Sequence, residues 1–173
     1  MVVKVKRNIP NKIHIIGSVG SGKTTLARNL SSKLNIPFYE LDNVVWRRFK
    51  SGDKRRTDDE RNEILNTIVQ TDAWIVEGVH HEWVSQSFQN AEWIIFLDTD
   101  FLKRKYRITK RFILQKIGLE HANYKPSFKM FKKMFQWNVY FENESKPEIL
   151  KILSQYNEKV IILRDNVEIE THL

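Results

Sequence analysis

The sequence contains no cysteine among its 173 residues. This absence excludes a disulfide framework, a thiolate zinc site and a cysteine nucleophile, and it is consistent with a reducing cytoplasm. No run of about 18 apolar residues occurs, so we expect no membrane-spanning helix and no membrane partner. The first residues are basic but have no apolar stretch behind them, which predicts no signal peptide. We therefore expect a cytoplasmic protein.

Glycine and proline are also scarce, with six and four residues, and no stretch rich in them or in serine divides the chain. No internal repeat or low-complexity tract is present. Hydrophobic residues make up 41% of the sequence and charged residues 29%, which is ordinary for a globular protein. A chain of this length can bury a substantial core, so we predict a single domain over residues 1–173.

Acidic residues are almost absent from one segment, residues 101–133. Eleven lysines and arginines stand there against one acid, Glu120. The segment carries 11 − 1 = +10, whereas the whole chain carries +8, so the other 140 residues sum to 8 − 10 = −2. Such a concentration of charge attracts polyanions, which include nucleic acids and nucleoside triphosphates.

Short apolar runs alternate with segments of helical periodicity. We predict strands at residues 12–16, 37–41, 73–77, 92–97 and 160–163, and helices at 23–34, 58–70, from 101, at 125–141, at 146–156 and after 165. The apolar runs are four to six residues long and bounded by turn residues, which is too short for buried helices. Their alternation with helices predicts an α/β fold with a five-stranded parallel sheet covered on both faces.

Three of these helices begin with side chains suited to capping. Thr57 with Glu60 has the capping-box spacing, and Ser145 with Glu148 repeats it. Asp98 is our preferred cap for the helix that begins near Phe101, in a stretch that also offers Asp100.

Residues 17–24 read Gly-Ser-Val-Gly-Ser-Gly-Lys-Thr and match the P-loop pattern G-x-x-x-x-G-K-[ST] at every fixed position. The glycines let backbone N–H groups turn inward around phosphate oxygens, and the following helix directs its positive end at the same anion. Lys23 is expected to reach the β and γ phosphates and Thr24 to bind Mg²⁺. The predicted nucleotide site consists of Gly17, Ser18, Gly20, Ser21, Gly22, Lys23, Thr24 and Thr25.

Other P-loop classes lack support in the sequence. No N-K-x-D follows a late strand and no D-x-x-G follows an earlier one, as a guanine-specific GTPase would require. An ABC or helicase motor needs a longer chain than 173 residues. Among the classes of P-loop protein, the small-molecule kinases are the one that the sequence still allows.

The order of motifs resembles that of adenylate-kinase-like and shikimate-kinase-like enzymes. The P-loop is followed by Leu41-Asp42, by Trp-Ile-Val-Glu-Gly at 74–78, by a strand leading to Asp98, and by an arginine-rich helix. More narrowly, residues 41–46 and 74–78 resemble the topology-modulation (FlaR-related) proteins. The resemblance covers nearly the whole chain. It implies a nucleoside-monophosphate-kinase-like fold and ATP- and Mg²⁺-dependent phosphoryl transfer to a small acceptor, with a mobile substrate flap near 43–60 and a basic lid near 104–145.

Two carboxylates follow predicted strands at the edge where ligands bind in open parallel sheets. Asp42 could orient an acceptor hydroxyl for attack on the γ-phosphate, or it could cap the short turn behind it. Glu77 could hold a Mg²⁺-bound water, or it could simply meet solvent at the end of its strand. In the proteins that the sequence resembles, the position of Glu77 is usually aspartate.

Arg104, Arg107 and Arg111 are spaced three and four apart and share one helix face. Such a face can clamp phosphates and neutralise transition-state charge, which is the role expected of Arg107 and Arg111 above all. The alternative is a solvated charged face. Because the run has no interleaved glutamate, we expect an anion to offset its repulsion.

The basic stretch 47–56 is predicted to be the substrate flap or else an unstructured surface loop. The alternative to a kinase is a nucleotide-dependent nucleic-acid-binding or regulatory protein that uses the positive segment on a polyanion.

Overall fold

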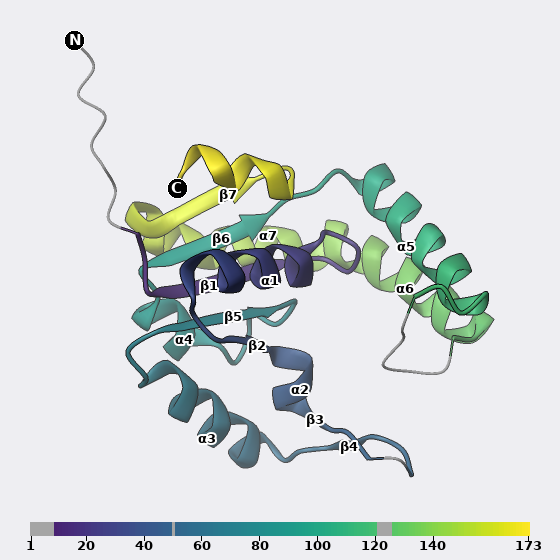
Figure 1. Cartoon of the computed structure of the whole chain (residues 1–173), viewed down its shortest axis with the longest axis horizontal. Helices are drawn as coiled ribbons and strands as arrows, with labels where there is room; N and C mark the ends of the chain where they lie inside the picture. The colour runs from purple at the N-terminus through teal and green to yellow at the C-terminus, as the bar shows by residue number, and fades with distance from the viewer. Residues whose placement is uncertain (1–8, 50, 121–125) are drawn as a thin grey trace.

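The computed structural model describes residues 9–49, 51–120 and 126–173. Five strands form one parallel sheet in the order β2-β5-β1-β6-β7 (Figure 1). They are β1 (Lys12–Gly17), β2 (Phe38–Glu40), β5 (Trp74–Gly78), β6 (Trp93–Leu97) and β7 (Val160–Leu163). Each bound lies within one residue of the predicted one, and the predicted α/β fold with a five-stranded parallel sheet is confirmed.

The central strand β1 pairs with partners that come much later in the chain. Lys12 of β1 is in register with Trp74 of β5, and Ile13 is in register with Trp93 of β6. Because all five strands are parallel, their carboxyl ends lie at one edge of the sheet, which is the edge where open α/β sheets bind ligands.

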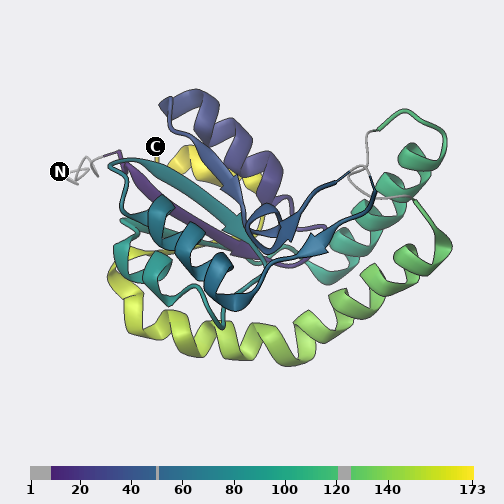
Figure 2. The same cartoon turned by 90° about the horizontal axis from the view of Figure 1, so that it is seen from below.

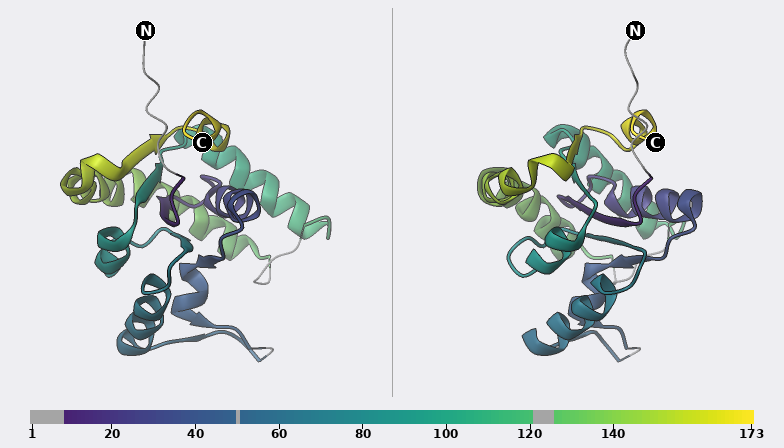
Figure 3. Two further views of the ribbon diagram at one scale, coloured as in Figure 1. Left: turned by 60° about the vertical axis from the view of Figure 1, so that its left-hand side comes forward. Right: turned by 90° about the vertical axis from the view of Figure 1, so that its left-hand side faces the viewer.

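Helices cover both faces of the sheet (Figures 1 and 3). The α-helices are α1 (Lys23–Leu34), α2 (Leu41–Val45), α3 (Asp58–Val69), α4 (Ser85–Asn90), α5 (Phe101–Lys116), α6 (Phe128–Tyr140) and α7 (Lys146–Leu153). A π-helical turn, η1 (Phe141–Ser145), joins α6 to α7, and two 3₁₀ segments, η2 (Ser154–Lys159) and η3 (Asn166–Thr171), flank β7. Within the described part of the chain, no helix is long and apolar enough to cross a bilayer.

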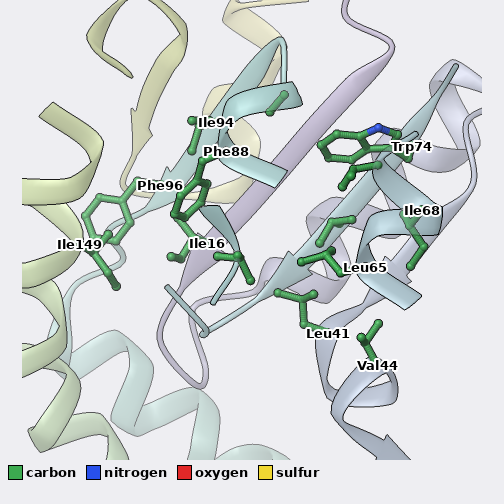
Figure 4. Packing of buried hydrophobic residues seen from close by; sticks show 14 of the residues in the cluster. Ile16, Leu41, Val44, Leu65, Ile68, Trp74, Phe88, Ile94, Phe96 and Ile149 are labelled. Carbon is green, nitrogen blue, oxygen red and sulfur yellow. The ribbon is translucent and has the colours of Figure 1, made fainter. Parts of the chain in front are cut away.

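Two hydrophobic clusters hold these layers together. Alternate residues of a strand point to opposite faces, so Ile16 of β1 joins one cluster whereas Ile13 and Ile15 join the other. The first cluster lies between the sheet and helices α3, α4 and α7, and Figure 4 shows part of it around Phe88 and Phe96. The second lies between the sheet, α1 and η3.

The predicted helix caps are partly confirmed. Thr57 and Glu60 form the capping box: the Thr57 hydroxyl accepts from the Glu60 amide at 3.2 Å, and the Glu60 carboxylate accepts from the Thr57 amide at 3.0 Å. The preference for Asp98 as the cap of α5 is wrong. Asp100 accepts from the Leu102 amide at 2.9 Å, because it stands directly before the first turn. Asp98 instead pairs with Lys146 at 2.7 Å.

The expected cap at Ser145 is also wrong. Helix α6 does not end before it but continues through η1 into α7, and Figure 2 shows the three as one long run of helix. The predicted start of the preceding helix at Lys125 lies outside the described residues. In the described part, α6 begins after Ser127, whose hydroxyl accepts from the Met130 amide at 3.2 Å.

Three small elements have no counterpart in the sequence prediction: α2, α4, and a hairpin of β3 (Trp46–Arg47) with β4 (Lys54–Arg55). The hairpin lies at the stretch 47–56, in which Arg47, Lys54 and Arg55 are the described residues that belong to strands. Arg47 pairs with Glu60 and Arg48 pairs with Asp53. These contacts connect the hairpin to itself and to the start of α3.

A buried histidine lies in the middle of the central strand. His14 is fully buried, and its Nδ1 lies 2.7 Å from the Ser87 hydroxyl. Burial, with a smaller effect of His80, lowers the pKa of His14 to about 3 from its ordinary 6.5.

We predict that this histidine makes the protein acid-sensitive. Between pH 6.5 and pH 3, His14 binds a proton in the unfolded chain but not in the folded chain. Its contribution to the free energy of unfolding is therefore complete above pH 6.5 and falls toward pH 3. Within this range the free energy of unfolding should fall by about 1.4 kcal/mol for each pH unit. Melting temperatures at pH 7 and pH 5 test this: His14→Gln should shrink the difference between them, whereas His172→Gln should leave it unchanged. An equal difference in all three proteins would contradict the prediction.

Candidate nucleotide-binding site

The glycine loop turns sharply between β1 and α1. Gly20 and Gly22 have φ values of 76° and 99°, a region that favours glycine. Both also lack room for a side chain. A Cβ on Gly20 would lie 3.0 Å from the Arg104 carbonyl oxygen, and one on Gly22 would lie 2.8 Å from the Asn166 side chain. The loop is therefore held in place by α5 on one side and by the start of η3 on the other.

The N-terminus of α1 is open to an anion. Its N-cap is Gly22, so no side chain caps it, and its first turn carries no acidic residue. The Ser21 hydroxyl beside it is buried and has no hydrogen-bond partner among the described residues. Uncapped N–H groups at a helix start and an unsatisfied buried hydroxyl fit phosphate oxygens.

Lys23 is the first residue of α1 and is buried. Its Nζ donates to the Ser18 carbonyl at 2.9 Å, so the side chain folds back over the loop. Burial lowers the pKa of Lys23, and the nearby carboxylates of Glu77 and Asp42 act in the opposite direction. A buried ammonium group is destabilising unless it is paired, and a bound phosphate would supply the missing negative charge.

Thr24 and Glu77 are in direct contact beside the glycine loop. The Thr24 hydroxyl donates to Glu77 Oε1 at 2.6 Å, which connects α1 to the end of β5. Burial raises the pKa of Glu77, although Lys23 and Thr24 offset part of the effect. A hydroxyl and a carboxylate are oxygen donors of the type that Mg²⁺ prefers, so these two residues fit the ion.

Asp42 is in the first turn of α2, just after β2. It does not cap that helix: the N-cap is Glu40, and no side-chain cap bond is formed. The capping alternative for Asp42 is therefore wrong. Its Oδ1 lies 3.6 Å from His80 Nε2. The pKa of Asp42 is lowered, chiefly by His80 and also by Lys23, so the carboxylate is ionised at neutral pH.

Arg107 reaches from α5 to the glycine loop. Its Nη1 donates to the Ser21 carbonyl at 2.7 Å, and its Nη2 lies 3.4 Å from Asp165. Arg111, one turn further, approaches the Met134 sulfur at 3.6 Å. Its positive charge also contributes to the lowered pKa of Lys23, and its spacing of four residues from Arg107 keeps it on the same face of α5.

Arg104 differs from the other two arginines. It is fully buried, and its Nη2 donates to the Glu142 carboxylate in η1. Glu142 also accepts from Lys146 at 3.2 Å. Carboxylates of the chain itself therefore offset part of the repulsion expected on this arginine face. Glu142 forms an ion pair with Arg104, and Asp165 forms one with Arg107. Both acids are distant from the arginines in sequence.

Further polar residues at the loop were not identified from the sequence. The Thr99 hydroxyl donates to the Ser21 carbonyl at 3.1 Å, and Asn166 donates to the Gly22 carbonyl at 3.2 Å. Buried Asn138 of α6 accepts from the Ser18 hydroxyl at 3.4 Å. Thr99 and Asn166 follow strands β6 and β7, and a position after a parallel strand is the one signal that could have revealed them.

The structure thus brings the glycine loop, Lys23, Thr24, Glu77 and Arg107 into direct contact. Asp42 and Arg111 lie near enough to influence the pKa of Lys23, but no hydrogen bond joins either of them to the loop. Thr25 follows Thr24 in α1 as predicted, and its side chain is exposed.

A parallel sheet whose central strand leads through a glycine loop into an uncapped helix defines a P-loop protein. The chain belongs to the AAA domain family AAA_18, whose model matches residues 13–117.

Among curated proteins, a shikimate kinase from Paracidovorax citrulli (strain AAC00-1) is 47% identical over 36 residues. That match spans 21% of this chain and only 20% of the relative. Among solved structures, a shikimate kinase from Bacteroides thetaiotaomicron has a TM-score of 0.49 at 16% identity, covering 78% of this chain and 81% of that one. A gluconokinase from Sinorhizobium meliloti 1021 has a TM-score of 0.46 at 16% identity, covering 91% and 83%. Both scores are below 0.5.

Proposed function

We propose that this protein transfers the γ-phosphoryl group of ATP, in the presence of Mg²⁺, to a small acceptor such as a nucleoside, a nucleotide or another hydroxyl or phosphate compound. One observation carries the proposal: the Thr24–Glu77 hydrogen bond of 2.6 Å places a hydroxyl and a carboxylate beside buried Lys23 in a glycine loop. The short match to a protein named shikimate kinase supports it. Within the small-molecule kinases, we propose that the protein is most similar to the topology-modulation (FlaR-related) proteins.

The loop amides and Lys23 would hold the phosphates, and Thr24 and Glu77 would hold the metal, Glu77 through a water. Bound Mg²⁺ would supply charge neutralisation at the phosphate oxygens. Asp42 accepts a hydrogen bond from the acceptor hydroxyl and so orients it. Because its pKa is lowered, Asp42 keeps this ability throughout the neutral range. Arg107 and Arg111 offset the charge that develops during transfer.

The acceptor would enter between two projecting parts. The β3–β4 hairpin and helices α5 and α6 both extend from the side of the sheet at which its strands end (Figure 1). We assign residues 43–60 as the acceptor flap and residues 104–145 as the lid within one domain. The strands of the hairpin and their described neighbours carry five basic side chains, which suits an acceptor with negative charge: Arg47, Arg48, Lys54, Arg55 and Arg56.

A ligand screen tests the proposed function. Nucleosides, nucleotides and sugar derivatives are added to the protein with Mg²⁺ and a non-hydrolysable ATP analogue, and the melting temperature is recorded. An acceptor at a hundred times its dissociation constant should stabilise the complex by about 2.7 kcal/mol, roughly 5–11 °C for a chain of this size. Each hit is then incubated with ATP, and its phosphorylation is followed by ³¹P NMR.

The expected result is ADP formation that depends on one class of hit. If no hit is phosphorylated and the protein binds DNA or RNA with steeply salt-dependent affinity, the kinase proposal is wrong and the nucleic-acid alternative replaces it.

A further inference from the structure

Helix α5 presents an unusual outer surface. Its arginines face the glycine loop, whereas four large apolar residues of the helix and its C-cap, Ile117, face solvent: Leu102 is 69% exposed, Tyr106 66%, Ile113 51% and Ile117 61%. At 100° per residue these four fall within about 60° of one another and form a single outer stripe along the helix. Leu119 and Phe128, at 75% and 73% exposure, extend the apolar surface past the end of α5.

Lysines border this outer stripe on both sides. Lys103 and Lys110 lie along one side by helical spacing, and Lys105 and Lys116 lie along the other. Lys103 pairs with Asp165, whereas Lys105 and Lys116 lie over aromatic rings, a contact that leaves their charge in place. Neither α5 nor α6 contains an acidic residue.

This combination indicates the chemistry of the partner. A second copy of the chain would bring lysines against lysines in a symmetric contact, which is repulsive. A single-stranded nucleic acid would need aromatic side chains on which its bases stack, but three of the four stripe residues are aliphatic. An apolar strip with a cationic border matches a bilayer surface, where apolar side chains enter the acyl boundary and lysines meet anionic headgroups.

We propose that the outer stripe of α5 binds the surface of an anionic membrane, with α5 lying flat in the interface. The sequence predicts no membrane partner because it has no stretch long enough to span a bilayer. A helix that lies flat in the interface needs no such stretch. The arginine face of α5 points the other way, toward the glycine loop, so membrane contact leaves the nucleotide site accessible.

Vesicle co-sedimentation tests the proposal with the full chain and without any assay of kinase activity. Vesicles of phosphatidylcholine with phosphatidylglycerol should bind the protein at least about ten times more strongly than vesicles of phosphatidylcholine alone. The double variant Ile113→Ser/Ile117→Ser should lose at least about tenfold in partitioning to the anionic vesicles. Lys110→Ala should lose about fivefold, as expected for one lysine near an anionic surface.

Ile162→Ser is the matched control, because Ile162 is 54% exposed on β7, away from α5 (Figure 1). It should bind as the unmodified protein does, and the melting temperatures of all variants should agree within a few degrees. Equal binding to both kinds of vesicle, or unchanged binding by the double isoleucine variant, overturns the proposal. Concentration-dependent dimerisation that this variant abolishes would assign the stripe to a second copy, and loss of oligonucleotide binding would assign it to nucleic acid.

Discussion

Lys23→Ala is expected to weaken the binding of ATP–Mg²⁺ at least about a hundredfold, which corresponds to about 2.7 kcal/mol. Lys23 Nζ is buried, and its hydrogen bond to the Ser18 carbonyl holds it over the glycine loop, where phosphate oxygens would lie. Charge-assisted bonds formed away from water are stronger than those at a surface. Isothermal titration calorimetry with ATP and Mg²⁺ measures the loss.

The fold should survive the substitution. Burial lowers the pKa of Lys23, so its charged form is less favourable in the loop than in water, and removing the charge should not lower the melting temperature. Lys33→Ala is the control: Lys33 lies in the last turn of the same helix, and its ion pair with Glu170 is exposed to solvent. That variant should bind nucleotide normally. Normal affinity in Lys23→Ala would contradict the assignment of the loop as a phosphate site.

Asp42→Asn is expected to leave ATP–Mg²⁺ binding unchanged and to reduce phosphoryl transfer about a hundredfold or more. The asparagine keeps the shape of the side chain but loses the charge that orients an acceptor hydroxyl. Asp42 caps no helix, so its replacement should cost little stability. The measurement is the single-turnover rate with the acceptor that the ligand screen identifies.

The pH dependence of transfer sharpens this test. Because its interaction with His80 lowers the pKa of Asp42, the carboxylate stays ionised down to acidic pH and should cause no loss of rate between pH 8 and pH 5. Asp72→Asn, in an exposed turn before β5, is the control and should transfer normally. A normal rate in Asp42→Asn would show that this carboxylate does not orient the acceptor hydroxyl. That result would leave the assignment of the glycine loop as the ATP site unchanged.

The sheet could be predicted because its signals are local. Strands such as 93–97 are short apolar runs bounded by turn residues, and the capping box at Thr57 lies within four residues of sequence. The P-loop is local as well, since a single eight-residue pattern contains its glycines, Lys23 and Thr24.

The rest of the site depends on contacts between distant parts of the chain. Arg104 meets Glu142 38 residues later, and Arg107 meets Asp165 58 residues later. No spacing rule connects such pairs, so the arginine face appeared unpaired in the sequence. The π turn at Phe141–Ser145, which carries Glu142, was likewise missed because the pattern Ser145–Glu148 resembles a helix start.

The strand order also determines when the protein can fold during synthesis. β1 lies at the centre of the sheet, yet neither neighbour exists until Gly78 and then Leu97 have been made. After Gly17 a ribosome must add 97 − 17 = 80 residues to reach Leu97, which takes roughly 4–16 s at 5–20 residues per second. Over that interval the apolar strand Ile13–Ile16 lacks at least one of its two sheet partners and remains exposed to chaperones and to other nascent chains. A chain released before Leu97 would keep that strand unpaired on one side, so truncated products should aggregate where the full chain folds.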